Sequence, residues 1–149
     1  MSIDQEVDIL RRIPIFAQID PAKLKLMAFA SERVTYKPGQ VLFKEGEQGD
    51  AAYIVLKGTA DILIDGNGEQ IRVASLSENE IIGEIAILCD IPRTATVQAA
   101  TELITLKITT DLFFRMLMDF PERGVEVMRV LAHRLEQTTA QLRRAQAGS

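Results

Sequence analysis

The apolar residues of this chain change their spacing twice along the sequence. Near both ends they recur at intervals of three and four residues, which is the spacing of an amphipathic helix. Between residues 34 and 108 they alternate with polar residues instead, as Leu106 and Ile108 do on either side of Lys107. A period of two is typical of half-buried strands. The sequence therefore predicts a helical region, then a sheet region, then a second helical region.

Glycines divide the sheet region into short segments. Six of the nine glycines fall within thirty residues, where they separate four apolar runs. These runs are 40–43, 51–57, 59–65 and 69–76. Asp65, Gly66, Asn67 and Gly68 form a hairpin-turn sequence, because Gly and Asn tolerate the positive φ values that such turns require. Short strands at this spacing predict an antiparallel barrel or jelly roll.

Two helices are expected before the sheet region. The first is a short amphipathic helix around Val7 to Arg12, broken by Pro14. The second begins at Asp20 and Pro21, because an aspartate can accept hydrogen bonds from first-turn amides and a proline at the first helical position loses no useful donor. Its core-facing residues are expected to be Leu24, Met27 and Ala28.

Two more helices are expected after the sheet region. A short one begins at Asp111 and ends before Pro121, and a long one runs from Pro121 to about Ala145, or about 37 Å at 1.5 Å per residue. The long helix carries a stripe at alternating steps of three and four: Met128, Leu131, Leu135, Thr138, Leu142 and Ala145. This spacing is that of a coiled-coil seam of about three heptads. The seam either pairs with a second copy of the chain or packs on the chain's own sheet, and the stripe alone does not decide between them.

The composition excludes several classes of function. With 149 residues, of which 47% are hydrophobic, the chain is expected to form one globular domain. Its net charge of −4 disfavours non-specific binding to nucleic acid. No uncharged stretch reaches the roughly 18 apolar residues that span a bilayer, and the N-terminus carries acids where a signal peptide needs basic residues. We therefore expect a cytoplasmic protein that binds neither nucleic acid nor membrane.

The chain contains one cysteine and one histidine. Cys89 has no partner for an internal disulfide, and together with His133 it provides too few ligands for a structural zinc site. Cys89 is expected to pack as a small hydrophobe and His133 to lie on a solvated helix face. The sequence offers no activated nucleophile, no acid–base pair and no metal-binding set. We therefore expect a binding protein rather than an enzyme, without cofactor or metal.

Residues 81–97, IIGEIAILCDIPRTATV, interrupt the strand pattern. A single helical turn between strands exposes free amides that can hold an anion, and the small side chain of Ala86 lets the anion approach the backbone. Arg93 offers a planar fork that matches two phosphate oxygens. Glu84 would repel an anion, so its place beside such a site indicates a hydroxyl donor. A phosphate with a neighbouring sugar hydroxyl fits this set.

The segment GEIAILCDIPRTATV resembles the phosphate-binding cassette of the cyclic-nucleotide-binding domains. This family includes catabolite activator proteins, regulatory subunits of cyclic-nucleotide-dependent kinases and cyclic-nucleotide-gated channels. Residues 10–24, 37–63 and 111–142 are similar to its N-terminal entry, its early strands and its closing helices. The resemblance implies a mainly β fold with flanking helices, in which an antiparallel, jelly-roll-like β-roll carries N-terminal helices and a long C-terminal helix. We expect one domain over residues 1–149, composed of 1–33, 34–109 with a cassette at 83–96, and 110–149.

The resemblance also implies which residues bind the ligand, cAMP or cGMP. Glu84 would hold the ribose 2′-hydroxyl, Arg93 the exocyclic phosphate oxygens, and amides near Ala86 and Ala95 the remaining phosphate acceptors. The expected ligand-binding set is Gly83, Glu84, Ile85, Ala86, Arg93, Thr94 and Ala95. Thr94 is either a base contact or simply a residue suited to a strand, so the base preference stays open. The family usually has an aromatic residue before the Gly-Glu pair, where this chain has Ile82.

The resemblance further implies a cassette that shifts when phosphate binds and signals to the closing helices. Ile87 is the switch residue expected on the cassette, with Phe113 or Phe114 as its partner, and Arg134 could cap the base. The chain stops where a catabolite activator would begin its helix-turn-helix. We therefore expect that it acts through an unidentified effector protein or is a piece of a longer chain. The alternative is a structural or dimerising module with a vestigial pocket, in which Glu84 and Arg93 simply form an ion pair.

Overall fold

The computed structural model describes residues 2–17 and 19–118. Its helices are α1 (Ile3–Arg11), α2 (Pro21–Ala30), α3 (Glu84–Cys89) and α4 (Thr110–Met118). Its strands are β1 (Glu32–Tyr36), β2 (Val41–Phe43), β3 (Ala51–Lys57), β4 (Ala60–Gly66), β5 (Glu69–Leu76), β6 (Ile81–Ile82), β7 (Thr96–Ala99) and β8 (Leu103–Thr109). The predicted order of helices, strands and closing helix is confirmed.

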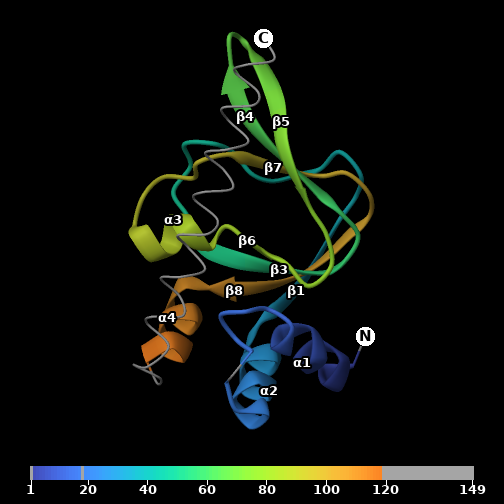
Figure 1. The fold of residues 1–149 in the computed structure, drawn as a ribbon, viewed down its shortest axis with the longest axis vertical. Helices are drawn as coiled ribbons and strands as arrows, with labels where there is room; N and C mark the ends of the chain where they lie inside the picture. The colour runs from blue at the N-terminus through green and yellow to red at the C-terminus, as the bar shows by residue number, and fades with distance from the viewer. Residues whose placement is uncertain (1, 18, 119–149) are drawn as a thin grey trace.

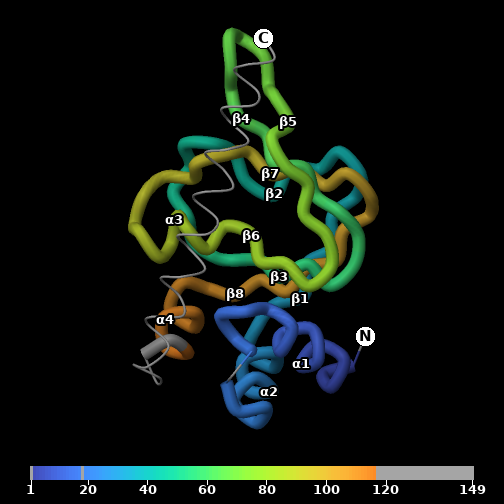
Figure 2. Tube along the Cα trace, in the orientation of Figure 1, coloured from blue at the N-terminus to red at the C-terminus, as the bar shows by residue number. Residues whose placement is uncertain are grey.

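The strands form two antiparallel sheets of four strands each, in the orders β1-β8-β3-β6 and β2-β7-β4-β5. Neighbours within each sheet are mostly distant in sequence, because the chain crosses repeatedly from one sheet to the other. Figure 2 shows the two sheets facing each other across the roll, with α3 at one side of it. This topology confirms the predicted jelly-roll-like β-roll.

The helices α1, α2 and α4 lie beneath the sheet that contains β3 (Figure 1). One apolar cluster fills the space between these helices and the sheet, and a second fills the interior of the roll. Strand β3 lies between the two clusters, so all residues from Ala51 to Leu56 are buried. The apolar run 51–57 of the sequence does not alternate, and in the structure both faces of β3 are covered.

Helix α1 begins earlier than the sequence analysis placed it. A capping box fixes its start: the backbone N–H of Gln5 donates to Oγ of Ser2 at 3.2 Å, and the backbone N–H of Ser2 donates to Oε1 of Gln5 at 2.9 Å. The expected start near Val7 is thus wrong by about one turn. The extra turn brings in Glu6, which is buried and accepts hydrogen bonds from Arg33 of β1. This pair ties α1 to the sheet.

Helix α2 matches its prediction closely. Oδ1 of Asp20 accepts a hydrogen bond from the backbone N–H of Ala22 at 2.9 Å, and Pro21 occupies the first helical position. The residues expected to face the core, Leu24, Met27 and Ala28, are buried. Local capping chemistry and apolar spacing were therefore sufficient to predict this helix.

The predicted hairpin turn joins β4 to β5. Asn67 has a φ of 51° and Gly68 a φ of 83°, as a two-residue turn of this kind requires. The hairpin extends beyond the rest of the roll (Figure 1). Its outer strand β5 is a sheet edge, so Ile71 is 37% exposed. The apolar side chains of β5 are therefore less buried than their alternation predicts, because little of the molecule packs against this strand.

The short helix predicted from Asp111 is confirmed as α4, which begins at Thr110. The long helix from Pro121, its proposed seam, His133 and Arg134 lie outside the described residues, and so the pairing of that seam stays a prediction. Among the residues described, no helix combines the length and apolar character needed to cross a bilayer.

Candidate functional site

The cassette begins where strand β6 ends. Gly83 has a φ of +83°, a conformation that side-chain-bearing residues rarely adopt, and it precedes the short helix α3. A Cβ at this position would also collide with Nη1 of Arg93. Both the backbone and the space therefore require glycine. The lone helical turn that the sequence predicted between the strands is confirmed.

The guanidinium of Arg93 is buried against Gly83, at the start of the cassette. Only 3% of the residue is exposed. Nη1 donates to the carbonyl oxygen of Gly83 at 2.8 Å, and Nη2 donates to the carbonyl oxygen of Ala51 at 2.7 Å. Its Cζ lies over the ring of Phe43, 3.9 Å from the ring centroid. Arg93 is thus held on three sides by groups from β2, β3 and the cassette.

The charge of Arg93 is only partly compensated. Nη2 lies 3.7 Å from Oδ1 of Asp50, whose side chain is 74% exposed. Burial lowers the pKa of Arg93 from its ordinary value, but a guanidinium remains protonated in proteins. Nε is buried and has no hydrogen-bond partner among the described residues. A buried cation with a donor still available is the arrangement that binds an anion.

Glu84 and Arg93 do not form the structural ion pair that the sequence left open. Both residues are described and buried, with 2% of Glu84 exposed. The ion pair of Arg93 within the described part of the chain is with Asp50 instead. The carboxylate of Glu84 and the guanidinium of Arg93 therefore do not neutralise each other directly.

The loop before β3 is hydrogen-bonded to the residues around Arg93. The backbone N–H of Gly46 donates to the carbonyl oxygen of Arg93 at 2.8 Å, and the N–H of Arg93 donates to that of Glu47 at 2.7 Å. A Cβ on Gly49 would lie 3.2 Å from the Cβ of Ala86 and 3.3 Å from Cζ of Arg93. Gly49 thus lets this loop pack closely against Ala86 and Arg93 of the cassette.

The remaining predicted residues differ in their exposure. Ala86 and Ala95 are buried, Ile85 is half-buried, and Thr94 is exposed. No side chain caps the first turn of α3. The structure brings Gly83 and Arg93 into contact and places Ala86 and Arg93 on either side of Gly49, whereas Thr94 lies at the surface.

The sequence analysis missed four residues that surround Arg93. The carbonyl oxygen of Ala51 accepts a hydrogen bond from Arg93, and the carboxylate of Asp50 forms an ion pair with it. Gly49 has no side chain to crowd the guanidinium, and the ring of Phe43 packs against it. The loop sequence from Lys44 to Ala51, with its glycines, belongs to a segment that already resembled the family's early strands. It could have indicated Gly49 and Asp50, whereas no sequence signal placed Phe43 against a guanidinium.

Two expectations about the apolar side chains of the cassette can be compared with the structure. Ile87 and Phe113 belong to the same apolar cluster, the one between the helices and the sheet. Phe114 is half-buried and packs edge-on against Phe113, with ring centroids 6.3 Å apart.

Cys89, expected to be packed, is exposed. That expectation is wrong because Cys89 ends α3, where Asp90 turns the chain away in a left-handed conformation.

Comparison with known proteins identifies the family. The profile described as cyclic nucleotide-binding domain matches residues 33–120. The chain belongs to this family. The resemblance carried by the cassette sequence is therefore confirmed, and so is the fold class that it implied.

Relatives of this cyclic nucleotide-binding domain include two kinds of regulatory protein. It is 34% identical over 109 residues to the cAMP-dependent protein kinase regulatory subunit of Blastocladiella emersonii, covering 72% of the chain and 27% of that relative. It is 29% identical over 136 residues to the CRP-like cAMP-activated global transcriptional regulator of Mycobacterium tuberculosis, covering 91% and 61%. The domain thus spans less than two thirds of each.

A solved relative has the same fold. The regulatory domain of Toxoplasma gondii PKA, crystallised with cAMP, superposes with a TM-score of 0.74 and 26% identity. The match covers 76% of this chain and 44% of that one. The β-roll described above is therefore the fold of a regulatory domain of this family.

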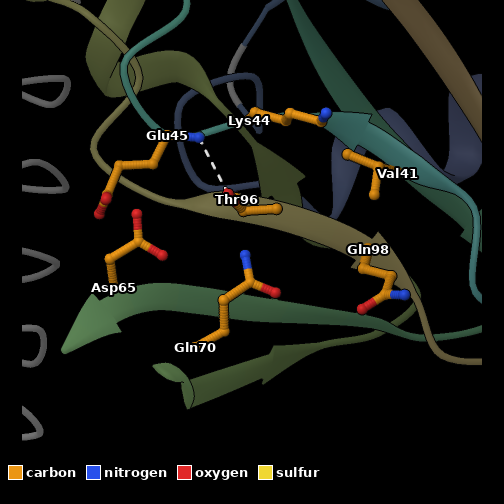
Figure 3. A pocket seen from close by; sticks show the side chains of 7 residues that line it. All are labelled: Val41, Lys44, Glu45, Asp65, Gln70, Thr96 and Gln98. Atoms are coloured by element: carbon orange, nitrogen blue, oxygen red, sulfur yellow. Dashed lines mark hydrogen bonds between the residues drawn. The ribbon is translucent and has the colours of Figure 1, made fainter. Parts of the chain in front are cut away.

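Away from the cassette, a groove lined mostly by polar and charged side chains lies on the outer face of the sheet that contains β7 (Figure 3). This groove of about 410 Å³ is lined by Val41, Lys44, Glu45, Asp65, Gln70, Thr96 and Gln98. The carboxylates of Glu45 and Asp65 face each other there. Burial and the neighbouring Asp65 raise the pKa of Glu45 above its ordinary value. Among the residues described, no three potential metal ligands gather in one place.

This carboxylate pair predicts a pH-dependent stability. Because the native state raises the pKa of Glu45, it keeps a proton that the unfolded chain releases, so the stabilisation is complete below the ordinary pKa and is lost as pH rises through the raised one. We expect Asp65→Asn to raise the melting temperature at pH 7 by about 1–2 °C and to flatten the acid dependence. Asp61→Asn is the control, because Asp61 lies 3.8 Å from Arg72 and gains nothing from neutralisation. Identical shifts in both variants would contradict this assignment.

Proposed function

We propose that this domain is a receptor for a cyclic purine nucleotide, cAMP or cGMP, which it binds without converting it. The observation that carries the proposal is the buried guanidinium of Arg93, which is held by two backbone carbonyls and whose Nε has no hydrogen-bond partner within residues 2–17 and 19–118. A cyclic phosphate carries one negative charge. One of its oxygens can accept a hydrogen bond from this Nε–H, and its charge can pair with the guanidinium. The two relatives, a cAMP-dependent protein kinase regulatory subunit and a cAMP-activated transcriptional regulator, support the same ligand class.

In this proposal each cassette residue has a separate role. Arg93 binds the exocyclic phosphate oxygens, and amides near Ala86 and Ala95 bind the remaining acceptors. Glu84 accepts a hydrogen bond from the ribose 2′-hydroxyl, while Gly83 lets the backbone approach the sugar. Backbone groups of Ile85 and the exposed side chain of Thr94 complete the set, with Thr94 nearest the solvent.

Calorimetric titration with cAMP and cGMP side by side tests the proposal. One-to-one binding in the micromolar range corresponds to about −8 kcal/mol, and ligand at 100 times its dissociation constant adds about 2.7 kcal/mol of stability. Chromatography should then recover the nucleotide intact. If neither nucleotide produces heat or a melting shift at millimolar concentration, the alternative of a structural module with a vestigial pocket replaces the proposal.

A deoxy analogue tests the role of Glu84. We expect Glu84→Ala to weaken binding of the ribonucleotide by about 1.5–3 kcal/mol, the range for a charge-assisted hydrogen bond. The 2′-deoxy nucleotide should bind the unmodified domain poorly and lose little more in the variant, since the bond is already absent. Glu78→Ala serves as the control because Glu78 is an exposed acid a few residues before the cassette. Equal losses for the two nucleotides would remove Glu84 from this role.

We further propose that the domain signals through its C-terminal helices to a partner in the cytoplasm. Ile87 and Phe113, which share one apolar cluster, are the proposed switch pair, with Phe114 beside them. A ligand can shift them only if it binds two arrangements of the cassette with different affinity. The partner is an effector protein, a second copy joined along residues 128–142, or both.

A further inference from the structure

The side chain of Phe43 occupies an unusual place for the last residue of a short strand. Strand β2 pairs with β7, and its register shifts between Val41 and Phe43, which face Gln98 and Val97. An extra residue in one strand redirects the side chains beside it. Here Cζ of Arg93 lies over the ring of Phe43, 3.9 Å from the ring centroid.

The hydrogen bonds of Arg93 do not by themselves determine the orientation of its guanidinium plane. Both hydrogen bonds are made by the terminal nitrogens, Nη1 to the carbonyl oxygen of Gly83 and Nη2 to that of Ala51. Rotation about the line between these two contacts would carry Nε out of its present direction. Cζ of Arg93 lies 3.9 Å from the centroid of the Phe43 ring, and a ring this close leaves little room for that rotation.

The ring is itself held in place from two sides. Its centroid lies 6.0 Å from that of Tyr53, with an angle of 32° between the planes, and Tyr53 is buried in β3. On the other side, Cε2 of Phe43 would lie 3.3 Å from a Cβ on Gly83. Phe43 therefore contacts the fixed wall of the roll and the start of the cassette at the same time.

This contact also compensates part of the cost of burying Arg93. The negative face of an aromatic ring attracts a cation, and the attraction is stronger where water is excluded. The nearest carboxylate, Asp50, is mostly exposed and 3.7 Å away. The ring therefore helps keep the cation in the site before any anion is bound.

We propose that Phe43 is a positioning residue, whose ring fixes the plane of the Arg93 guanidinium so that Nε faces the bound anion. The inference rests on the proposed function for the identity of that anion, a cyclic nucleotide phosphate. A donor oriented in advance loses less freedom on binding, which raises affinity without a new contact to the ligand. Phe43 acts only through Arg93.

A nitrogen-15 spectrum of the arginine side chains tests this without any ligand. In the unmodified domain, the Nε–H signal of Arg93 should be protected from exchange and displaced by the ring current of Phe43. Phe43→Leu keeps an apolar side chain but removes the ring, so the displacement and the protection should be lost. Phe43→Tyr keeps the ring and should restore both. Phe43→Met provides a second ring-free variant in case leucine does not fold, and circular dichroism checks the fold of each.

Titration with cAMP gives the functional readout. Phe43→Leu should weaken binding roughly tenfold, Phe43→Tyr less than about threefold, and Phe43→Leu should have little further effect in an Arg93→Lys background. An Arg93 signal that is unchanged in the ring-free variants overturns the inference, as does full additivity of the two substitutions. If the unmodified domain binds no nucleotide while the signal still depends on the ring, the proposed function fails and the positioning of Arg93 by Phe43 stands.

Discussion

Arg93→Ala is expected to weaken nucleotide binding by about 2–5 kcal/mol, the cost of truncating one partner of a buried charge pair. The structure adds a cost in stability, because the variant leaves the carbonyl oxygens of Gly83 and Ala51 without their donor. Losing two such bonds should lower the free energy of unfolding by about 1–3 kcal/mol. The β-roll should nevertheless remain folded, since Arg93 belongs to neither apolar cluster.

Calorimetry and urea unfolding on the same preparations separate the two effects. Arg93→Lys keeps the charge but loses the planar fork, so its affinity should lie between those of the alanine variant and the unmodified domain. Arg72→Ala is the control, because Arg72 is exposed on the hairpin and pairs only with Asp61, at 3.8 Å, within the described residues. A nucleotide affinity that is unchanged in Arg93→Ala would defeat the role assigned to this residue.

The parts of the fold that depend on neighbours in sequence could be predicted from the sequence. The start of α2 follows from Asp20 and Pro21, and the hairpin follows from Asn67 and Gly68, because each needs only its own backbone chemistry. The capping box of α1 was equally local and was overlooked, which is why that helix begins at Ile3 rather than near Val7.

Features that depend on the crossing of distant strands could not be predicted. The continuous apolar run of β3 is consistent with burial on both faces, but it does not show that helices cover one face and the interior of the roll the other. The contact between Phe43 and Arg93 joins residues fifty positions apart and depends on a register shift in β2. The exposure of Cys89 likewise depends on where α3 ends against the rest of the fold.

The candidate site lies between these two cases. Glu84 and Arg93 were identified from the type and spacing of residues in one segment and Gly83 from the family resemblance, and the structure brings Gly83 and Arg93 into contact. The chemistry of these cassette residues could thus be inferred from the local sequence. The groups that hold Arg93 in place come from β2 and β3, and only the folded chain brings them to the cassette.

Gly83→Ala is expected to impair both folding and binding, and a second glycine allows the two causes to be separated. Gly83 and Gly68 both have a φ of +83°, but only Gly83 has neighbours within reach of a Cβ. Alanine at either position should lose about 1–2 kcal/mol of stability from the left-handed backbone alone. Gly68→Ala should then leave nucleotide affinity unchanged, since its turn lies at the tip of the hairpin.

The additional loss of nucleotide affinity in Gly83→Ala should result from displacement of the Arg93 side chain. The new Cβ would clash with Nη1, so we expect the guanidinium to shift away from the carbonyl oxygen of Gly83 and to turn Nε away from the anion. We expect an affinity loss of at least tenfold, or about 1.4 kcal/mol, in calorimetry. In an Arg93→Ala background there is no guanidinium to displace, so Gly83→Ala should then cost little more stability than Gly68→Ala does. If the two glycine variants lost equal affinity in the unmodified background, the effect of Gly83 would be one of backbone strain and not of the position of Arg93.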